Sequence, residues 1–161
     1  MTYLDGAWLA AGLAAAFAVF LLVLLRRRAR APEVVLDGSN VMHWGGDGAS
    51  LDTVRAVLAE VERLGMRAGV VFDANAGWKL VGRYVDDAEM ARLLGLPRSR
   101  VLVVPKGTPA DPTILQAARD RRARVVTNDR FRDWAGDFPE VARPGHLLRG
   151  RVRGGTVALR L

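Results

Sequence analysis

Short apolar runs alternate with amphipathic stretches along residues 33–161. Each run consists mostly of aliphatic residues and ends at a polar or turn-forming residue, which is typical of a buried strand. The runs predict strands at 33–36, 67–72, 101–104 and 124–126. The stretches between them predict helices at 51–64 and 86–94, a third that begins at Asp111-Pro112, and a short one after Asp129 that ends at Trp134. Residues 141–161 predict an edge hairpin that turns at Gly154-Gly155.

The order of these elements predicts the fold class. Strands that alternate with helices, and that are apolar over nearly their whole length, are typical of a parallel sheet with helices on both faces. We therefore expect an α/β domain built as three layers (α/β/α), with a central sheet that is mainly parallel.

A different pattern occupies the N-terminus. Residues 7–25 form a run of 19 residues without a charge. As a helix this run would reach roughly 28 Å, close to the thickness of the hydrocarbon core of a membrane. Trp8 lies near its start, and four arginines follow it: Arg26, Arg27, Arg28 and Arg30. This order is the reverse of a signal peptide, so the sequence favours a retained transmembrane helix. A cleaved signal ending at residues 29–31 and a buried soluble helix are the alternatives.

The arginine cluster also predicts the orientation of the chain. By the positive-inside rule, the N-terminus lies outside and everything after Arg26 lies in the cytoplasm. The predicted organisation is an N-terminal tail (1–6), a transmembrane helix (7–25), a basic juxtamembrane linker (26–32) and a folded domain (33–161). The bias toward Ala, Arg, Gly and Val is typical of a GC-rich bacterial genome. The predicted location is therefore the bacterial inner (cytoplasmic) membrane, with a single pass.

Composition narrows the classes of function. The 161 residues include 24 Lys+Arg and 17 Asp+Glu, a net charge of +7. Residues 1–30 account for +3 of this charge, which leaves only +4 for the folded domain. The apolar content of 50% excludes a disordered chain, and the absence of Cys excludes disulfide partners, Fe–S clusters and Cys-ligated zinc. So modest a basic excess does not by itself predict nucleic-acid binding.

Polar side chains gather where the predicted strands end. They form three clusters: Asp37/Ser39/Asn40, Asp73/Asn75 and Thr127/Asn128/Asp129. The carboxyl ends of parallel strands share one edge, where ligands bind, and Asp111 is expected to face the same edge. Asp133 comes four residues after Asp129, so a helix would place both carboxylates on one face. Oxygen donors of this kind suit Mg²⁺ or Mn²⁺. The alternative is structural: helix caps at Asp111 and Asp129, and an ordinary turn at Asp37.

Three stretches together match the motifs of a known family, and their order and spacing cover most of residues 33–148. They are Val34-Val-Leu-Asp-Gly-Ser-Asn-Val41, Ala110-Asp111 and Val125-Val-Thr-Asn-Asp-Arg-Phe-Arg-Asp133. They resemble the NYN-domain branch of the PIN-like ribonucleases, particularly the Regnase-type enzymes. The resemblance implies a PIN-like fold and a metal-binding set of Asp37, Asp111, Asp129 and Asp133, with Asn40 beside them. The family tends to show two adjacent acids where this chain has Ala110-Asp111. Its second strand does not usually end in Asp-Ala-Asn, so Asp73 is a candidate replacement.

The implied activity is a ribonuclease reaction, hydrolysis of RNA phosphodiester bonds with Mg²⁺ or Mn²⁺ as cofactor. Asp37 and Asp129 are the candidate direct ligands, Asp111 and Asp133 would bind a second ion or orient the water, and Ser39, Asn128 and Asp73 are additional candidates. One alternative is a catalytically weak or inactive RNA-binding or scaffold module, favoured by the single acid at Asp111. Another is a phosphohydrolase of small phosphate esters, disfavoured because no Asp-x-Asp follows the first strand.

Basic residues near the predicted edge are the candidates for RNA contact: Lys79, Arg83, Lys106, Arg149 and Arg151. A solvated surface is the alternative for each of them. Trp44 and Trp78 could stack on bases or pack in the core. The predicted partners are RNA and, through residues 7–25, the lipid bilayer, and a homodimer is left open.

Overall fold

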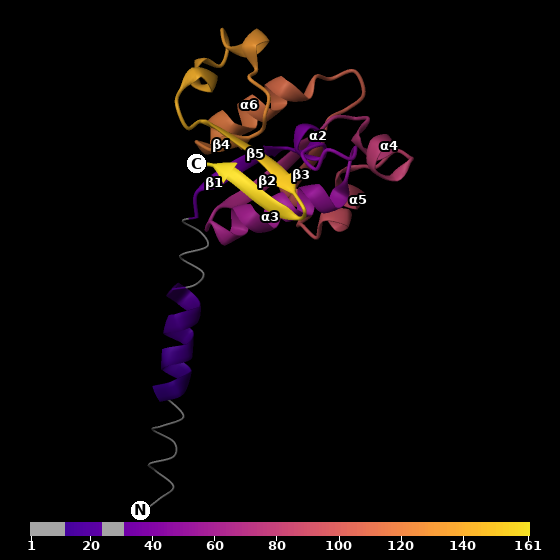
Figure 1. Cartoon of the computed structure of the whole chain (residues 1–161). Coiled ribbons are helices and arrows are strands. Elements are labelled where there is room, and N and C mark those ends of the chain that lie inside the picture. Colours follow the sequence, from indigo (N-terminus) through magenta and orange to yellow (C-terminus); the bar gives the residue numbers. More distant parts are fainter. Residues whose placement is uncertain (1–11, 24–30) are drawn as a thin grey trace, which may run out of the picture. The chain divides into compact units, whose positions relative to one another are not determined.

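The computed structural model describes residues 12–23 and 31–161 (Figure 1). The chain divides between Ala31 and Pro32 into two units, which are considered separately. In the first unit, residues 12–23 form a helix with exposed apolar side chains such as Phe17 and Phe20. Neither this helix nor any helix in 31–161 is both long and apolar enough to span a membrane. The predicted transmembrane helix at 7–25 lies partly outside the described residues. The tail at 1–6 lies wholly outside them, and so does the linker at 26–32 except for its last two residues.

The second unit is built on a six-stranded sheet of order β3-β2-β1-β4-β5-β6. The first five strands in this order are parallel, and β6 runs antiparallel to β5. The strands are β1 Glu33–Asp37, β2 Arg67–Phe72, β3 Val101–Val103, β4 Arg124–Val126, β5 Leu147–Arg153 and β6 Thr156–Arg160. The predicted α/β class with a mainly parallel sheet is confirmed. The C-terminal hairpin turns at Gly154-Gly155 as expected, but β5 pairs with β4, so only β6 lies at the edge.

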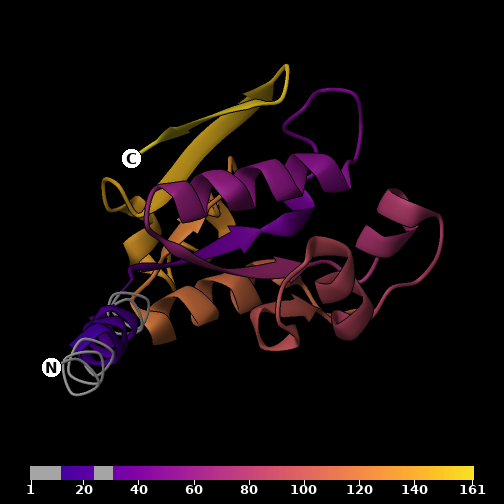
Figure 2. The ribbon, with the colours of Figure 1, turned by 90° about the horizontal axis from the view of Figure 1, so that it is seen from below.

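Helices cover both faces of this sheet. α3 (Leu51–Arg63) and α6 (Ala110–Arg121) lie on opposite faces (Figure 2). α5 (Asp87–Leu94) packs in the same hydrophobic cluster as α3. Ser50 caps α3 through a hydrogen bond from the Thr53 backbone N–H, as its position before the apolar periodicity predicts.

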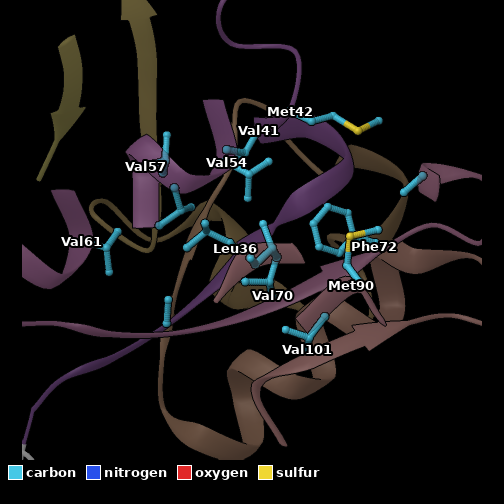
Figure 3. Packing of buried hydrophobic residues seen from close by; sticks show 14 of the residues in the cluster. Leu36, Val41, Met42, Val54, Val57, Val61, Val70, Phe72, Met90 and Val101 are labelled. Carbon is cyan, nitrogen blue, oxygen red and sulfur yellow. The ribbon is translucent and has the colours of Figure 1, made fainter. Parts of the chain in front are cut away.

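The core consists of two clusters, one on each face, because successive residues of a strand point to opposite sides. On the α3 face, Leu36, Val70 and Phe72 of the strands meet Val54 of α3 and Met90 of α5 (Figure 3). On the α6 face, the cluster is formed by residues such as Val35, Ile114 and Phe131. All buried side chains of the described residues belong to this unit, so it has a core of its own.

Two short helices were not expected from the sequence, namely α2 (Gly38–Val41) and α4 (Ala76–Val81). Both are too short to show a periodic apolar face. α2 lies directly over β2, because a Cβ atom on Gly38 would come within 2.4 Å of the Phe72 ring. Glycine at this position therefore allows the turn after β1 to pack closely against the neighbouring strand.

Two local predictions at the acidic edge were wrong. α6 begins at Ala110, with Pro109 before it, so Asp111 lies inside the first turn and is not its cap. Asp129 and Asp133 do not share a helix face, because Phe131 adopts a left-handed conformation (φ 48°) between them. Only a short 3₁₀ turn, Arg132–Trp134, follows.

Candidate active site

Asp37 ends β1, and its side chain is buried, with the residue only 6% exposed. The hydroxyl of Thr127, which follows β4, donates to Asp37 Oδ2 at 2.9 Å, and the backbone N–H of Asn40 donates to Oδ1 at 3.1 Å. Burial raises the pKa of Asp37 from 3.8 to about 6, with smaller contributions from repulsion by Asp111 and Asp73, and the two hydrogen bonds oppose the rise. One carboxyl group at this edge therefore titrates close to neutral pH.

Asp111 is the second acid of this edge whose pKa is raised. Partial burial raises its pKa, and repulsion from Asp129, Asp73 and Asp133 raises it further. Asp37 is repelled in turn by Asp111 and Asp73. The fold thus brings all five predicted aspartates into one electrostatically coupled group at the carboxyl edge of the sheet.

Ser39 and Asp73 join the ends of two neighbouring strands. The backbone N–H of Asp73, directly after β2, donates to Ser39 Oγ at 2.8 Å. Ser39 lies in α2, the turn that follows β1. Its hydroxyl therefore acts on the position of Asp73 by holding the backbone.

Asn40 and Asn128 form a brace between three elements. Asn40 Oδ1 accepts hydrogen bonds from Trp44 Nε1 at 2.8 Å and from the backbone N–H of Asn128 at 2.9 Å. The Asn128 amide pairs with Gly150 of β5, donating to its carbonyl at 2.8 Å and accepting from its N–H at 3.1 Å. These contacts make both asparagines positioning residues for the loops that carry Asp37 and Asp129. Trp44 packs against the core rather than standing free.

The loop around Asp129 is shaped by its own side chain. Asp129 Oδ1 accepts from the backbone N–H of Phe131 at 2.7 Å, and the Asp129 N–H donates to Thr127 Oγ1 at 3.0 Å. The same Thr127 hydroxyl therefore contacts the buried carboxylate at the end of β1 and the backbone of the exposed Asp129 after β4. Asp133 is exposed on the 3₁₀ turn beyond.

The five predicted RNA-contacting cations differ in their freedom. The side chains of Lys79, Lys106 and Arg151 are exposed and make no hydrogen bond or ion pair within residues 31–161. Arg83 is paired with Glu89, which raises the pKa of its guanidinium. Arg149 donates to the backbone carbonyl of Asn128 at 2.8 Å, so it supports the Asp129 loop.

The donor set fits a hard divalent cation. It consists of carboxylate oxygens whose mutual repulsion a bound cation would relieve. In the described parts of the chain, no three Asp, Glu, His or Cys side chains lie close enough together to form a complete metal cage. Mg²⁺ does not require one, since it is usually held by one or two carboxylates together with waters and substrate phosphates.

Two residues support the acids although the sequence assigns neither of them a role in the site; Thr127 was predicted only as a member of a polar cluster at a strand end. Thr127 stands next to the Asn-Asp pair in the chain, so its position after a strand offered a signal. The Trp134 side chain donates a hydrogen bond that opposes the rise in the Asp111 pKa. Nothing local in the sequence indicates this contact, because it depends on how the loop after β4 packs against α6.

A scan against family models matches residues 30–145 to the Zc3h12a-like ribonuclease NYN domain. This match covers well over half of the chain. The chain belongs to the Zc3h12a-like ribonuclease NYN domain family. The predicted class of enzyme, a metal-dependent ribonuclease, is thereby confirmed at the level of the family. A search of the curated proteins gave no match.

Solved structures support the fold of this NYN domain. Two solved chains of a protein-only RNase P, nuclear PRORP2 from Arabidopsis thaliana, are similar to it. One gives a TM-score of 0.61 at 17% identity and covers 99% of this chain, and the other gives 0.60 at 20% identity and covers 98%. This chain spans only 37% and 35% of the length of those two, so the likeness concerns the fold of one domain.

Proposed function

We propose that the acidic edge of this NYN domain hydrolyses RNA phosphodiester bonds with a bound divalent cation. The observation that carries the proposal is the coupled group of five aspartates, in which burial and mutual repulsion raise the pKa of Asp37 and of Asp111. Folding pushes like charges together here at a cost in stability. Strain of this kind is typical of a functional site.

The position of each side chain indicates the role that we propose for it. Asp37 and Asp111 would hold the cation, and Asp73 would supply the acid that the family tends to place beside Asp111 (where this chain has the buried Ala110). Asp129 and Asp133, at the exposed side, would complete the coordination or orient the attacking water. When bound, Mg²⁺ or Mn²⁺ polarises the scissile phosphate and lowers the pKa of a water molecule. Lys79 and Lys106 would contact phosphates of the RNA.

Cleavage of a labelled single-stranded RNA by the full chain tests this proposal. We expect cleavage with Mg²⁺ or Mn²⁺, none with EDTA, and a loss of at least a hundredfold in Asp111→Asn. The matched control is Asp52→Asn, because Asp52 is an exposed acid on α3 that pairs only with Arg55. Cleavage that persists in EDTA, or that Asp111→Asn leaves unchanged, would refute the proposal.

A second function has one observation in its favour. The position beside Asp111 is taken by Ala110, which is 5% exposed and packed in the core, so the edge has one acid fewer than the family tends to show. A module that binds RNA without cutting it would satisfy this geometry. It predicts RNA affinity that is equal with and without Mg²⁺, together with no cleavage under any metal.

Location at the bacterial inner membrane remains part of the proposal. It is supported by the uncharged run at 7–25 and by the arginines that follow it. Fractionation of cells expressing the full chain tests it, with the double substitution Leu21→Arg and Leu22→Arg as the comparison. The expected result is a membrane-bound wild type and a released variant, and equal distribution of the two would contradict the proposal.

A further inference from the structure

An exposed apolar surface lies beside the acidic edge. Within residues 31–161, the large hydrophobic side chains with the greatest exposure are Trp78, Val81, Tyr84, Leu102 and Leu161. Three of these five fall within seven residues of one another: Trp78 and Tyr84 are each 59% exposed, and Val81 is 36% exposed. A concentration of exposed aromatic side chains is typical of an interaction surface.

Close backbone packing brings together the two segments that carry the aromatic residues. Trp78 lies in α4, and Tyr84 lies in the loop that follows it. A Cβ atom on Gly77 would come within 2.6 Å of the Arg83 carbonyl oxygen and 2.8 Å of the Val85 nitrogen. The backbone beside Trp78 therefore lies close to the backbone on both sides of Tyr84, so the two exposed aromatic residues belong to neighbouring segments.

The helix that carries Trp78 begins directly beside an acid of the site. The backbone N–H of Ala76, the first residue of α4, donates to the carbonyl of Asp73 at 3.0 Å. Asp73 belongs to the coupled acidic group, since its charge acts on both Asp37 and Asp111. A six-residue helix is only about 9 Å long, so Trp78 lies within a short distance of the acids.

The charges around the rings favour a polyanion with flat groups. Lys79, next to Trp78, is exposed and unpaired within the described domain. Arg83 is already neutralised by Glu89, so the surface offers one free cation beside two aromatic rings. Aromatic side chains with a neighbouring cation bind single-stranded nucleic acid by stacking on its bases. Stacking requires unpaired bases, which a duplex does not present.

We propose that Trp78 and Tyr84 form a stacking platform that binds unpaired RNA bases next to the acidic edge. The proposal rests on the proposed function, because it names the part of the RNA that this site engages. The platform would select RNA that is single-stranded beside the scissile bond. Lys79 would contact a phosphate of the same strand.

Binding of a 5′-labelled single-stranded RNA, followed by fluorescence anisotropy in Mg²⁺, tests the platform. The full chain carries Asp111→Asn as background, so cleavage does not interfere. We expect Trp78→Ala and Tyr84→Ala each to weaken binding roughly tenfold, and Trp78→Phe and Tyr84→Phe to retain most of it. Leu161→Ala removes an equally exposed apolar side chain (67% exposed) elsewhere and should leave binding unchanged.

An RNA of the same length whose bases have been removed separates stacking from charge. The wild-type surface should bind this abasic RNA roughly tenfold more weakly than intact RNA, and Trp78→Ala should remove that difference. Gly77→Ala, which forces α4 away from the Arg83–Val85 backbone, should weaken binding of intact RNA like Trp78→Ala. If Trp78→Ala weakens the binding of intact and abasic RNA equally, the proposal is overturned. Unchanged binding of intact RNA in Trp78→Ala would also overturn it and would leave a protein partner as the ligand of this surface.

The outcome also separates this proposal from the proposed function. If the Trp78→Ala chain, which is otherwise wild type, cleaves RNA with an unchanged KM, the stacking proposal is refuted and the nuclease proposal stands. RNA binding that depends on Trp78, in a chain that cleaves nothing with any metal, would refute the nuclease and leave the platform intact.

Discussion

Asp37 shows how burial of an acid opposes folding at neutral pH. Its carboxyl group is buried beside other acids, and its pKa is raised from 3.8 to about 6. The folded chain therefore binds this proton more tightly than the unfolded chain does. Asp37 contributes most stability below about pH 4, and this contribution is lost as the pH rises through about 6.

Asp37→Asn should consequently stabilise the metal-free protein at pH 7. The pKa shift from 3.8 to about 6 corresponds to about 3 kcal/mol as an upper value. Urea unfolding in EDTA should show a gain of 1–3 kcal/mol, as an order-of-magnitude range, at pH 7 that disappears near pH 4. Asp52→Asn is the control and should change stability by only a few tenths of a kcal/mol, roughly. A loss of stability in Asp37→Asn at pH 7 would show that the buried charge of Asp37 does not destabilise the fold.

Thr127 links Asp37 to the loop that carries Asp129. Its buried hydroxyl donates to Asp37 Oδ2 and accepts from the Asp129 N–H. Thr127→Val leaves both partners unsatisfied, at a cost of about 1–3 kcal/mol in unfolding free energy. We expect cleavage to fall about tenfold or more, because the acids lose their relative positions. Thr127→Ser keeps the hydroxyl and should retain most of the stability and most of the cleavage rate. Equal effects of Thr127→Val and Thr127→Ser would show that the hydroxyl does not position the acids.

The acids themselves could be predicted from the sequence, and their supports mostly could not. Asp37, Asp73 and Asp129 follow strands, and strand ends share an edge in any parallel sheet. The contact between Asn40 and Asn128 links residues 88 positions apart, so no local pattern encodes it. The left-handed conformation of Phe131, which overrides the expected helix, arises in a loop held by the Asp129 side chain.

Among the elements, α6 and the segment after β4 together build the outer side of the site. Arg119 of α6 donates two hydrogen bonds to Glu140, at 2.7 and 2.8 Å, and lies 4.4 Å from the centroid of the Phe138 ring. The same guanidinium donates to the Asp137 carbonyl at 2.7 Å. One side chain thus fastens the segment that carries Asp133 to the helix that carries Asp111.

Arg119→Ala should therefore loosen this segment without unfolding the sheet. We expect faster amide hydrogen exchange in residues 131–142, while exchange in β1 and β2 stays slow. The pKa of Glu140 is lowered to about 2, first by its hydrogen bonds from Arg119, so the fastening is lost only as the pH falls from 4.5 toward 2. Arg121→Ala, two residues away and 3.8 Å from Glu33, is the control. Unchanged exchange at 131–142 in Arg119→Ala would contradict the role of this contact.

Elements with a long periodic face were predicted well. The apolar positions of α3 recur over its 13 residues, and β1 to β4 consist mostly of continuous apolar runs. α2 and α4 have four and six residues, too few for a period to show. The pairing of β5 with β4 depends on a connection of some twenty residues, whose path the local sequence does not specify.

For the whole molecule, the small net charge of the domain predicts weakly salt-dependent RNA binding. Six cations near the site have exposed side chains that make no hydrogen bond or ion pair within residues 31–161, namely Lys79, Lys106, Arg130, Arg132, Arg151 and Arg153. Contacts with all six on single-stranded RNA would give a slope of about −4 in log K against log [salt]. Anisotropy at several salt concentrations measures this slope, and Lys79→Ala should reduce it by about 0.7. A slope far steeper than about −4 would require a basic surface outside these six residues.

Calorimetric titration of the full chain with Mn²⁺ shows directly whether this acidic edge is the metal centre of a ribonuclease. We expect binding to the wild type, loss of that binding in Asp111→Asn, and retention in Asp52→Asn. Asp111 is the decisive residue because it is coupled to every other acid of the group. Equal Mn²⁺ affinity in the wild type and in Asp111→Asn would mean that the acidic edge is not the metal centre.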